Sequence, residues 1–314
     1  MELIFLFLTI LGLSLFEIIT SVDNAIINAE VLSGVSKKAR HWFLTWGFLF
    51  AVFVIRGLLP LAIFWLANPQ LGFMSALSAS FSSDQKILGS IEQSAPLLLI
   101  AGGVFLIFIF FNWLFLEPKN YGLFGERFFQ AQGAWFFAVV SILLAVIVWF
   151  ALKENPLMAF SAVLGSTAFF IIHGFRQYAE EQEQKLKRGS GGLSDIAKVA
   201  YLEVLDASFS IDGVIGAFAF TFAVPLILLG NGLGALVLRQ LTVSNIERIK
   251  RYKYLKNGAM YSILFLGVIM LLDSFGYHLP AWLSPIVTFT TVGYFWRMSK
   301  IQMEDVEKAL LPKN

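Results

Sequence analysis

Long apolar stretches separated by short polar connections run through the whole chain. A membrane-spanning helix needs about 20 mainly apolar residues. Nine stretches meet this requirement: 3–31, 42–66, 96–116, 134–152, 157–175, 198–220, 223–243, 258–274 and 281–297. The pattern predicts an all-α polytopic membrane protein with about nine transmembrane helices.

The composition agrees with this class. Of the 314 residues, 58% are hydrophobic and 14% are charged, whereas soluble domains carry about 25% charged residues. Cysteine is absent, which excludes disulfides and thiolate metal sites. A net charge of +2 gives no reason to expect a nucleic-acid partner. The N-terminus lacks the features of a signal peptide, so we expect the first stretch to be retained in contact with the lipid bilayer.

Lys and Arg are distributed unevenly between the connections, and cytoplasmic connections are normally the richer ones. With the N-terminus outside, 19 of the 23 Lys and Arg residues fall in inner segments. Only Lys86 and Lys153 fall in outer segments, while Arg56 and Arg239 lie within spans. The distribution predicts that the N-terminus is outside and the C-terminus is inside.

One acidic motif, acid-x-x-x-Ser-x-Asp, occurs twice within apolar sequence at an offset of 189 residues without a gap. The copies are Glu17, Ser21 and Asp23, followed by Asn24, and Asp206, Ser210 and Asp212, followed by Gly213. Five predicted crossings separate the copies, so they enter the membrane from opposite faces. This arrangement predicts two inverted-topology repeats, which in many transporters place a site at the midplane.

The expected organisation follows from these repeats. It comprises a first transmembrane repeat over 1–117, a connector with two spans and a solvated cytoplasmic linker over 118–197, a second repeat over 198–299 and a cytoplasmic tail over 300–314. The tail has a weak amphipathic pattern and is expected to lie along the inner membrane surface.

The charges predicted within spans need neutralisation, because each costs about 2.5–3.5 kcal/mol on insertion scales. Four motif carboxylates and the guanidiniums of Arg56 and Arg239 leave two negative charges, which one divalent cation would balance. Oxygen ligands suit Mn²⁺, Ca²⁺ and Mg²⁺. Convergence of all the motif side chains requires unwinding near 20–24 and 209–213. Alternatively, Asp23 and Asp212 pair with the two arginines and leave Glu17 and Asp206 to the ion.

Three further acids are candidates of lower rank. Glu203 lies on the same helix face as Asp206, three residues away. Glu117 and Asp273 close predicted spans and would act as gates or proton acceptors, or as interfacial caps. A simpler interpretation of all these polar residues is that they are interhelical hydrogen-bonding groups.

The chain resembles the TerC/Alx family of bacterial integral membrane proteins in the two motif copies, the segment 204–220 and the paired Arg56 and Arg239. Segment 204–220 is especially similar to an uncharacterised, DUF-type branch. The resemblance implies an inverted-repeat fold in the bacterial inner membrane and, for some relatives, export of manganese or related divalent ions. Other relatives belong to tellurium-resistance gene clusters. The motif match implies an ion-site role for Glu17, Ser21, Asp23, Asn24, Asp206, Ser210 and Asp212. Gly213 departs from the family pattern, so the two halves are expected to contribute unequally to the ion site.

Three functions are compatible with these features. The first is a secondary transporter that exports a divalent cation, with Mn²⁺ preferred; no GxxxxGK[ST] motif for ATP is present. The second is a non-transporting membrane component of a metal or tellurium stress complex, whose loops dock soluble cytoplasmic partners. The third, an intramembrane hydrolase, lacks both the Gly-x-Gly-Asp and the HExxH patterns, so we expect no enzymatic activity. Ion identity, coupling and oligomeric state stay open.

Overall fold

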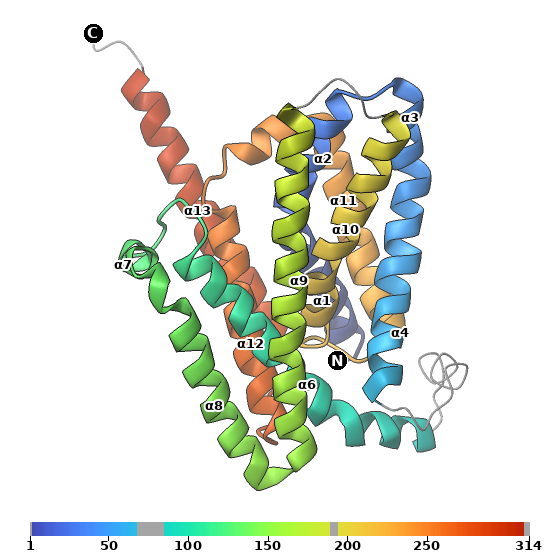
Figure 1. Cartoon of the computed structure of the whole chain (residues 1–314), viewed down its shortest axis with the longest axis vertical. Helices are drawn as coiled ribbons and strands as arrows, with labels where there is room; N and C mark the ends of the chain where they lie inside the picture. Colours follow the sequence, from blue (N-terminus) through green and yellow to red (C-terminus); the bar gives the residue numbers. More distant parts are fainter. Residues whose placement is uncertain (1, 68–84, 189–193, 311–314) are drawn as a thin grey trace.

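The computed structural model describes residues 2–67, 85–188 and 194–310. Within these ranges the chain is built of helices joined by turns and has no strand (Figure 1). The prediction of an all-α protein is therefore confirmed.

A helix covers most of each of the nine predicted stretches. In chain order the helices are α1 (Glu2–Thr20), α2 (Val22–Ser33), α3 (Lys37–Trp42), the π-helical turns η1 (Phe43–Gly47) and η2 (Phe50–Ile55), α4 (Arg56–Ala67), α6 (Gln85–Phe115), α7 (Glu126–Ala131), the 3-10 turn η3 (Gly133–Trp135), α8 (Phe136–Glu154), α9 (Pro156–Arg188), α10 (Asp195–Ala217), α11 (Val224–Lys250), α12 (Leu255–Ser274) and α13 (Leu283–Leu310).

Several of these helices have the length and hydropathy of membrane spans. Among the described residues there are six: Leu3–Thr20, Lys37–Ile63, Ser94–Phe115, Gly133–Glu154, Pro156–Tyr178 and Leu255–Ser274. Val224–Gln240 is apolar but shorter. The chain is therefore a multi-pass helical membrane protein, whereas the count of nine spans, the repeats and the orientation remain predictions.

The outward faces of the peripheral helices are apolar. On α8 and α9, large side chains such as Ile142, Trp149, Phe160 and Ile171 are exposed. Such side chains are unfavourable in water but are favoured in contact with lipid tails, so these faces fit the lipid environment that the apolar spans require.

The core is held together by close approach of helices at small residues. A Cβ added at Gly103 of α6 would lie 2.9 Å from the carbonyl oxygen of Gly267 in α12, and one at Gly165 of α9 would overlap the carbonyl of Ala101 in α6. Helices in membranes associate through such packing, because lipid gives no hydrophobic drive for their association. α6 is thereby fixed between α12 and α9.

The first predicted repeat contains two interrupted helices. α1 ends at Thr20 and α2 begins at Val22, so the chain deviates from helical geometry at Ser21, where φ is −99° and ψ is 3°. The rod formed by α3, η1, η2 and α4 contains π-helical turns, which re-aim side chains relative to a regular helix and are frequent at functional sites.

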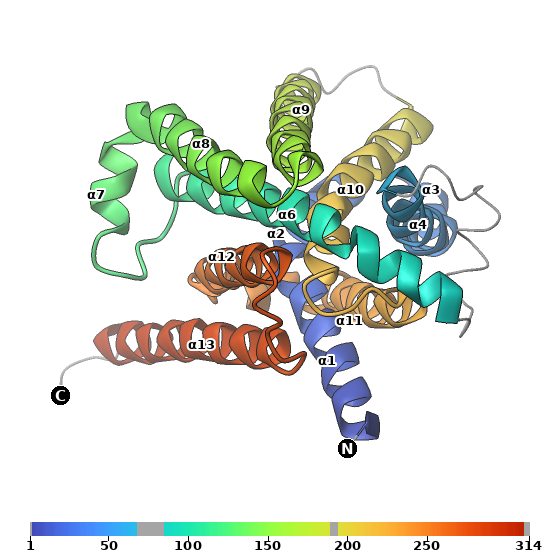
Figure 2. The same ribbon diagram turned by 90° about the horizontal axis from the view of Figure 1, so that it is seen from below.

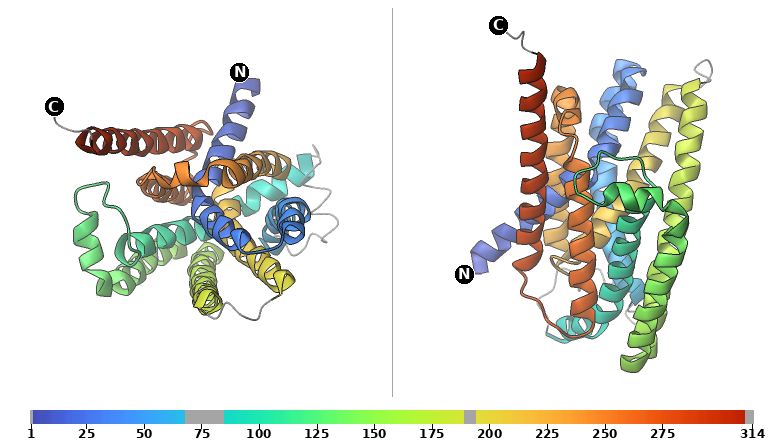
Figure 3. Two further views of the ribbon diagram at one scale, coloured as in Figure 1. Left: turned by 90° about the horizontal axis from the view of Figure 1, so that it is seen from above. Right: turned by 90° about the vertical axis from the view of Figure 1, so that its left-hand side faces the viewer.

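α1 crosses the bundle obliquely, with its N-terminal end projecting and its C-terminal half buried in the interior (Figure 3). It packs against α11, α13, α12 and α10. Seen from below, α10, α11 and the rod containing α4 surround one side of it (Figure 2). Segments far apart in the sequence therefore meet around α1 and α2.

Two helices extend beyond the predicted spans. The fifth predicted stretch ended at residue 175, but α9 continues to Arg188, and residues 189–193 lie outside the described part. α13 runs without a break from Leu283 to Leu310, across the predicted boundary between the last span and the tail (Figure 1). In both places good helix-forming residues prolong a span into polar sequence. The solvated cytoplasmic linker and the position of the tail along the inner membrane surface remain predictions.

Candidate functional site

Ser21 is the point at which the first motif bends. Its hydroxyl donates a hydrogen bond to Oε1 of Glu17 at 3.0 Å. The helix is interrupted at Ser21 alone, without a glycine, and the expected unwinding over 20–24 is reduced to a kink, because the backbone N–H groups of Ser21 and Ala25 still donate to the carbonyls of Glu17 and Ser21 at 3.1 and 3.0 Å. The interruption re-aims α2, so that Asn24 and Asn28, one turn apart, both face a cavity described below.

The second motif does not bend. α10 is continuous from Asp195 to Ala217, so the unwinding predicted near 209–213 was wrong. The Ser210 hydroxyl donates to the backbone carbonyl of Asp206 at 2.6 Å instead of to a carboxylate. Such a bond to the preceding turn is compatible with an intact helix.

Arg56 joins the two motif copies. Its Nε and a terminal nitrogen donate to Oε1 of Glu17 at 3.0 and 2.7 Å, and its other terminal nitrogen lies 3.5 Å from Oδ2 of Asp206. The Glu17 side chain is 0% exposed, that of Arg56 4% and that of Asp206 16%. One guanidinium therefore holds carboxylates from both halves of the chain inside the protein.

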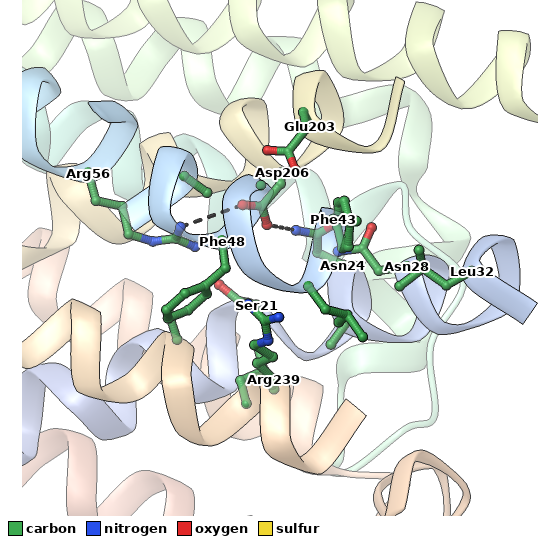
Figure 4. Close-up of a pocket in the computed structure, with 16 residues that line it drawn as sticks. Ser21, Asn24, Asn28, Leu32, Phe43, Phe48, Arg56, Glu203, Asp206 and Arg239 are labelled. Carbon is green, nitrogen blue, oxygen red and sulfur yellow. Dashed lines mark hydrogen bonds and ion pairs between the residues drawn. The ribbon is translucent and has the colours of Figure 1, made fainter. Parts of the chain in front are cut away.

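Asn24 completes the contact between the halves. Its amide nitrogen donates to Oδ1 of Asp206 at 2.5 Å (Figure 4). Asp206 on α10 is thus bound from two sides, by Arg56 and by Asn24.

Glu17 is bound differently. Among the described residues, its Oε2 has no hydrogen-bond partner although it is buried. This oxygen faces α10 at Gly213, where an added Cβ would lie only 2.7 Å from it. Gly213 therefore permits the acid of α1 to approach the backbone of α10.

A cavity of about 70 Å³ adjoins these charges (Figure 4). Its walls come from α2, the rod that contains η1 and η2, α10 and α11. They include Ser21, Asn24, Asn28, Leu32, Phe43, Phe48, Arg56, Glu203, Asp206 and Arg239. Each water molecule occupies about 30 Å³ in the liquid, so the space is sufficient for a few waters or one small ion.

Glu203 and Arg239 belong to this wall. The Glu203 carboxylate packs directly on Gly47 of η1, where a Cβ would overlap its Oε1. The guanidinium of Arg239 lies 4.8 Å from the ring centroid of Phe48, a cation–π contact. The candidate of lower rank, Glu203, thus lies beside Asp206 in the cavity wall.

The structure separates Asp212 from this cavity. Its Oδ1 lies 2.7 Å from a terminal nitrogen of Arg176 on α9. The sequence left open an alternative in which Asp23 and Asp212 pair with Arg56 and Arg239. For Asp212 this alternative was wrong, because Asp212 binds Arg176, and Arg56 binds Glu17 and Asp206. The Asp23 side chain lies outside the described part of the structure. Arg176 lies just after the predicted stretch 157–175 and within the candidate membrane span Pro156–Tyr178.

Glu117 and Asp273 make their contacts near the ends of α6 and α12. Glu117 accepts from Asn112 at 3.2 Å and lies 2.8 Å from Nζ of Lys256. Asp273 accepts from the backbone N–H of Leu279 at 2.6 Å, at the end of α12. Of the two roles considered for these acids, the contacts favour interfacial caps.

No cluster of three or more His, Asp or Glu side chains that could by itself hold a metal ion occurs among the described residues. Any cation in this region must therefore use amide or hydroxyl oxygens as well, or replace Arg56 between its carboxylates. Sequence analysis missed Asn28, although its spacing of four residues from Asn24 is a usable signal.

Comparisons with known proteins agree with the membrane assignment. An uncharacterized membrane protein of Bacillus subtilis (strain 168), YceF, is 28% identical over 168 residues, which cover 52% of this chain and 61% of that protein. No solved structure matches the chain. The sequence profile described as "Protein of unknown function (DUF475)" matches residues 22–304. Because this match covers most of the chain, the protein belongs to the DUF475 family.

Proposed function

We propose that this protein is a secondary transporter that exports a divalent metal cation, with Mn²⁺ as the first candidate. The observation that carries the proposal is the single buried guanidinium of Arg56 that holds both Glu17 and Asp206 beside a cavity. Ionisable groups within a membrane protein are costly, and they commonly mark the path of an ion.

The charge balance of this region favours a cation. Glu17, Asp206 and Glu203 carry three negative charges when ionised, whereas Arg56 and Arg239 carry two positive charges. The oxygen-rich wall offers ligands that hard cations prefer. In this proposal Arg56 acts as an internal counter-ion that a bound cation displaces from Asp206 during transport.

The architecture proposed for this activity is nine spans in two inverted repeats, with the N-terminus outside, in the bacterial inner membrane. Two glycine contacts support the repeat. Gly47 packs on Glu203, and Gly234 packs on Ser14, with its added Cβ 2.5 Å from the Ser14 carbonyl. The offset of 189 residues that relates the motif copies also relates Ser14 to Glu203, and Gly47 and Gly234 are 187 residues apart, so the two contacts correspond to within two residues. The resemblance to TerC/Alx proteins supports the same arrangement.

The proposed orientation places the cavity on the cytoplasmic side. Its walls extend along α2 towards Leu32 and along the rod towards Phe43, near the α2–α3 connection. That connection is predicted to be an inner one. A cavity on this side would receive the ion from the cytoplasm, as export requires.

Mn²⁺ flux in proteoliposomes tests the proposal. Purified wild type should move Mn²⁺, and Glu17→Gln and Asp206→Asn should each reduce the flux to background, because each removes a charge bound by Arg56. Asp273→Asn, which changes a turn cap at the end of α12, is the matched control and should keep its flux. Each variant is compared only if it elutes as a single species.

Undiminished flux in both site variants would refute the assignment of the site. Absence of flux in correctly folded wild type, with any of Mn²⁺, Ca²⁺ or Mg²⁺, would refute transport and favour a non-transporting membrane component.

A further inference from the structure

Three buried side-chain oxygens without a hydrogen-bond partner among the described residues belong to residues that line the cavity. They are Oδ1 of Asn24, Oδ1 of Asn28 and Oε1 of Glu203. Asn24 is 2% exposed and Asn28 is 8% exposed. Buried polar atoms are nearly always satisfied, so each exception calls for a physical reason.

The fold determines the positions of these oxygens. Asn24 and Asn28 lie one turn apart on α2, which the interruption at Ser21 re-aims. Glu203 lies on α10, and its carboxylate reaches its place because residue 47 has no side chain. Figure 4 shows Asn24, Asn28 and Glu203 around the same space, with Asp206 between Glu203 and Asn24.

The chemistry of the set selects a cation. All three free atoms are acceptors, and Asp206 adds a carboxylate whose Oδ1 already accepts from Asn24. Arg56 and Asn24 already donate to Glu17 and Asp206, and the Arg239 guanidinium lies over the ring of Phe48. Whatever fills the cavity must therefore supply positive charge or donors of its own.

We propose that Asn24, Asn28 and Glu203 form a loading site for a hard divalent cation, distinct from the Glu17–Arg56–Asp206 ion pairs. Amide and carboxylate oxygens, completed by water, are the ligands such ions take. The ion binds here while Arg56 still holds Glu17 and Asp206 together. The site gives the proposed transporter an entry position, and in that sense it rests on the proposed function.

Mn²⁺ binding tests the site independently of transport. Full-length protein in lipid nanodiscs is titrated with Mn²⁺, and the electron paramagnetic resonance signal of free Mn²⁺ reports binding. Asn28→Leu, which keeps the approximate size but removes the oxygen, and Glu203→Gln, which removes the charge, should each weaken binding by about tenfold, because ligand charge and number set the affinity of oxygen sites.

A matched control is available in the same region of the fold. Asn231 of α11 is 0% exposed, and neither of its side-chain polar atoms has a partner among the described residues, yet it does not line the cavity. Asn231→Leu should leave Mn²⁺ binding unchanged. Both Asn→Leu variants should raise the melting temperature, since each removes an unsatisfied buried group.

A gain-of-binding variant keeps the test decisive if Asn28→Leu does not fold. Asn28→Asp adds a carboxylate to the site and should tighten Mn²⁺ binding by about tenfold. Unchanged affinity in Asn28→Asp and Glu203→Gln would overturn the loading site and indicate that the cavity holds only water. Wild type that binds Mn²⁺ without moving it would refute transport but leave this site standing.

Discussion

Glu17 and Gly213 lie directly against each other across the interface between α1 and α10. The buried Oε2 of Glu17 is 2.7 Å from the position that a Cβ at residue 213 would take. By the 189-residue offset, Gly213 corresponds to Asn24, which donates to Asp206, and Asp206 corresponds to Glu17. The two halves therefore make corresponding contacts, but the second half lacks the amide and leaves one oxygen of Glu17 without a donor.

Gly213→Ala should destabilise the protein, because the new methyl group would push the carboxylate of Glu17 away from Arg56. Overpacking of this kind costs about 1–3 kcal/mol. Thermal unfolding in detergent should show a lower melting temperature. Gly174→Ala is the matched control: it lies in α9 with no atom within 4 Å of the added Cβ, so its melting temperature should be unchanged or higher. Equal stability of the two variants would contradict the close contact.

Arg56→Leu should be among the most destabilising single changes in the chain. It leaves Glu17 and Asp206 buried without their shared counter-charge, and breaking a buried ion pair costs about 3–5 kcal/mol. Addition of Glu17→Gln to Arg56→Leu should recover part of the loss, because it removes one uncompensated charge. Arg297→Leu, at an exposed position of α13, serves as the control and should change the melting temperature little.

Arg176 and Asp212 should be energetically coupled. Their pair links α9 to the second motif at 2.7 Å, with side chains 15% and 11% exposed. A double-mutant cycle with Arg176→Gln and Asp212→Asn should give an interaction energy of about 0.5–3 kcal/mol. Strictly additive effects on stability would show that the pair does not connect these helices.

Lys119 should respond to alkaline pH. It lies in the connection between α6 and α7, where its ammonium donates to the carbonyls of Trp113 and Leu114, and burial lowers the pKa of Lys119 from 10.5 to about 8. The folded protein therefore releases this proton before the unfolded chain does. Its contribution to stability should accordingly rise as the pH increases from about 8 to 10.5.

The pH dependence of Lys119 acetylation, followed by mass spectrometry, measures this shift. The folded protein should show a midpoint near 8, whereas the same lysine in denatured protein should show its ordinary value. Identical profiles in the two states would contradict the burial of the ammonium. In Lys119→Met the rise of melting temperature with pH should be weaker.

Some of the helices were predictable from the sequence to within a few residues. Stretch 134–152 corresponds to α8, Phe136–Glu154, and stretch 258–274 to α12, Leu255–Ser274. Apolar length indicates a span because each helix satisfies its own backbone hydrogen bonds in lipid. The extent of α6, α9, α11 and α13 beyond the membrane-length stretches was missed, because polar helix formers and linker residues have similar composition.

The two copies of the motif show where prediction from sequence stopped. Both contain a serine four residues after the acid, yet Ser21 bonds to the carboxylate at a break and Ser210 bonds to the backbone in a continuous helix. The glycine at 213 suggested flexibility, whereas it serves close packing against Glu17. Whether the serine bonds to the carboxylate or to the backbone depends on what each helix packs against. The local sequence does not contain this information.

The sequence by itself determined that this protein is an all-helical membrane protein with acids repeated in its two halves, because hydropathy and motif spacing are local properties. Only the tertiary structure decided that Arg56, and not a metal ion held by a cluster of acids, joins Glu17 to Asp206. It also decided that Asp212 pairs with Arg176. The partner of a buried charge is set by the rotation and closeness of neighbouring helices, and these follow from packing at residues such as Gly47, Gly213 and Gly234.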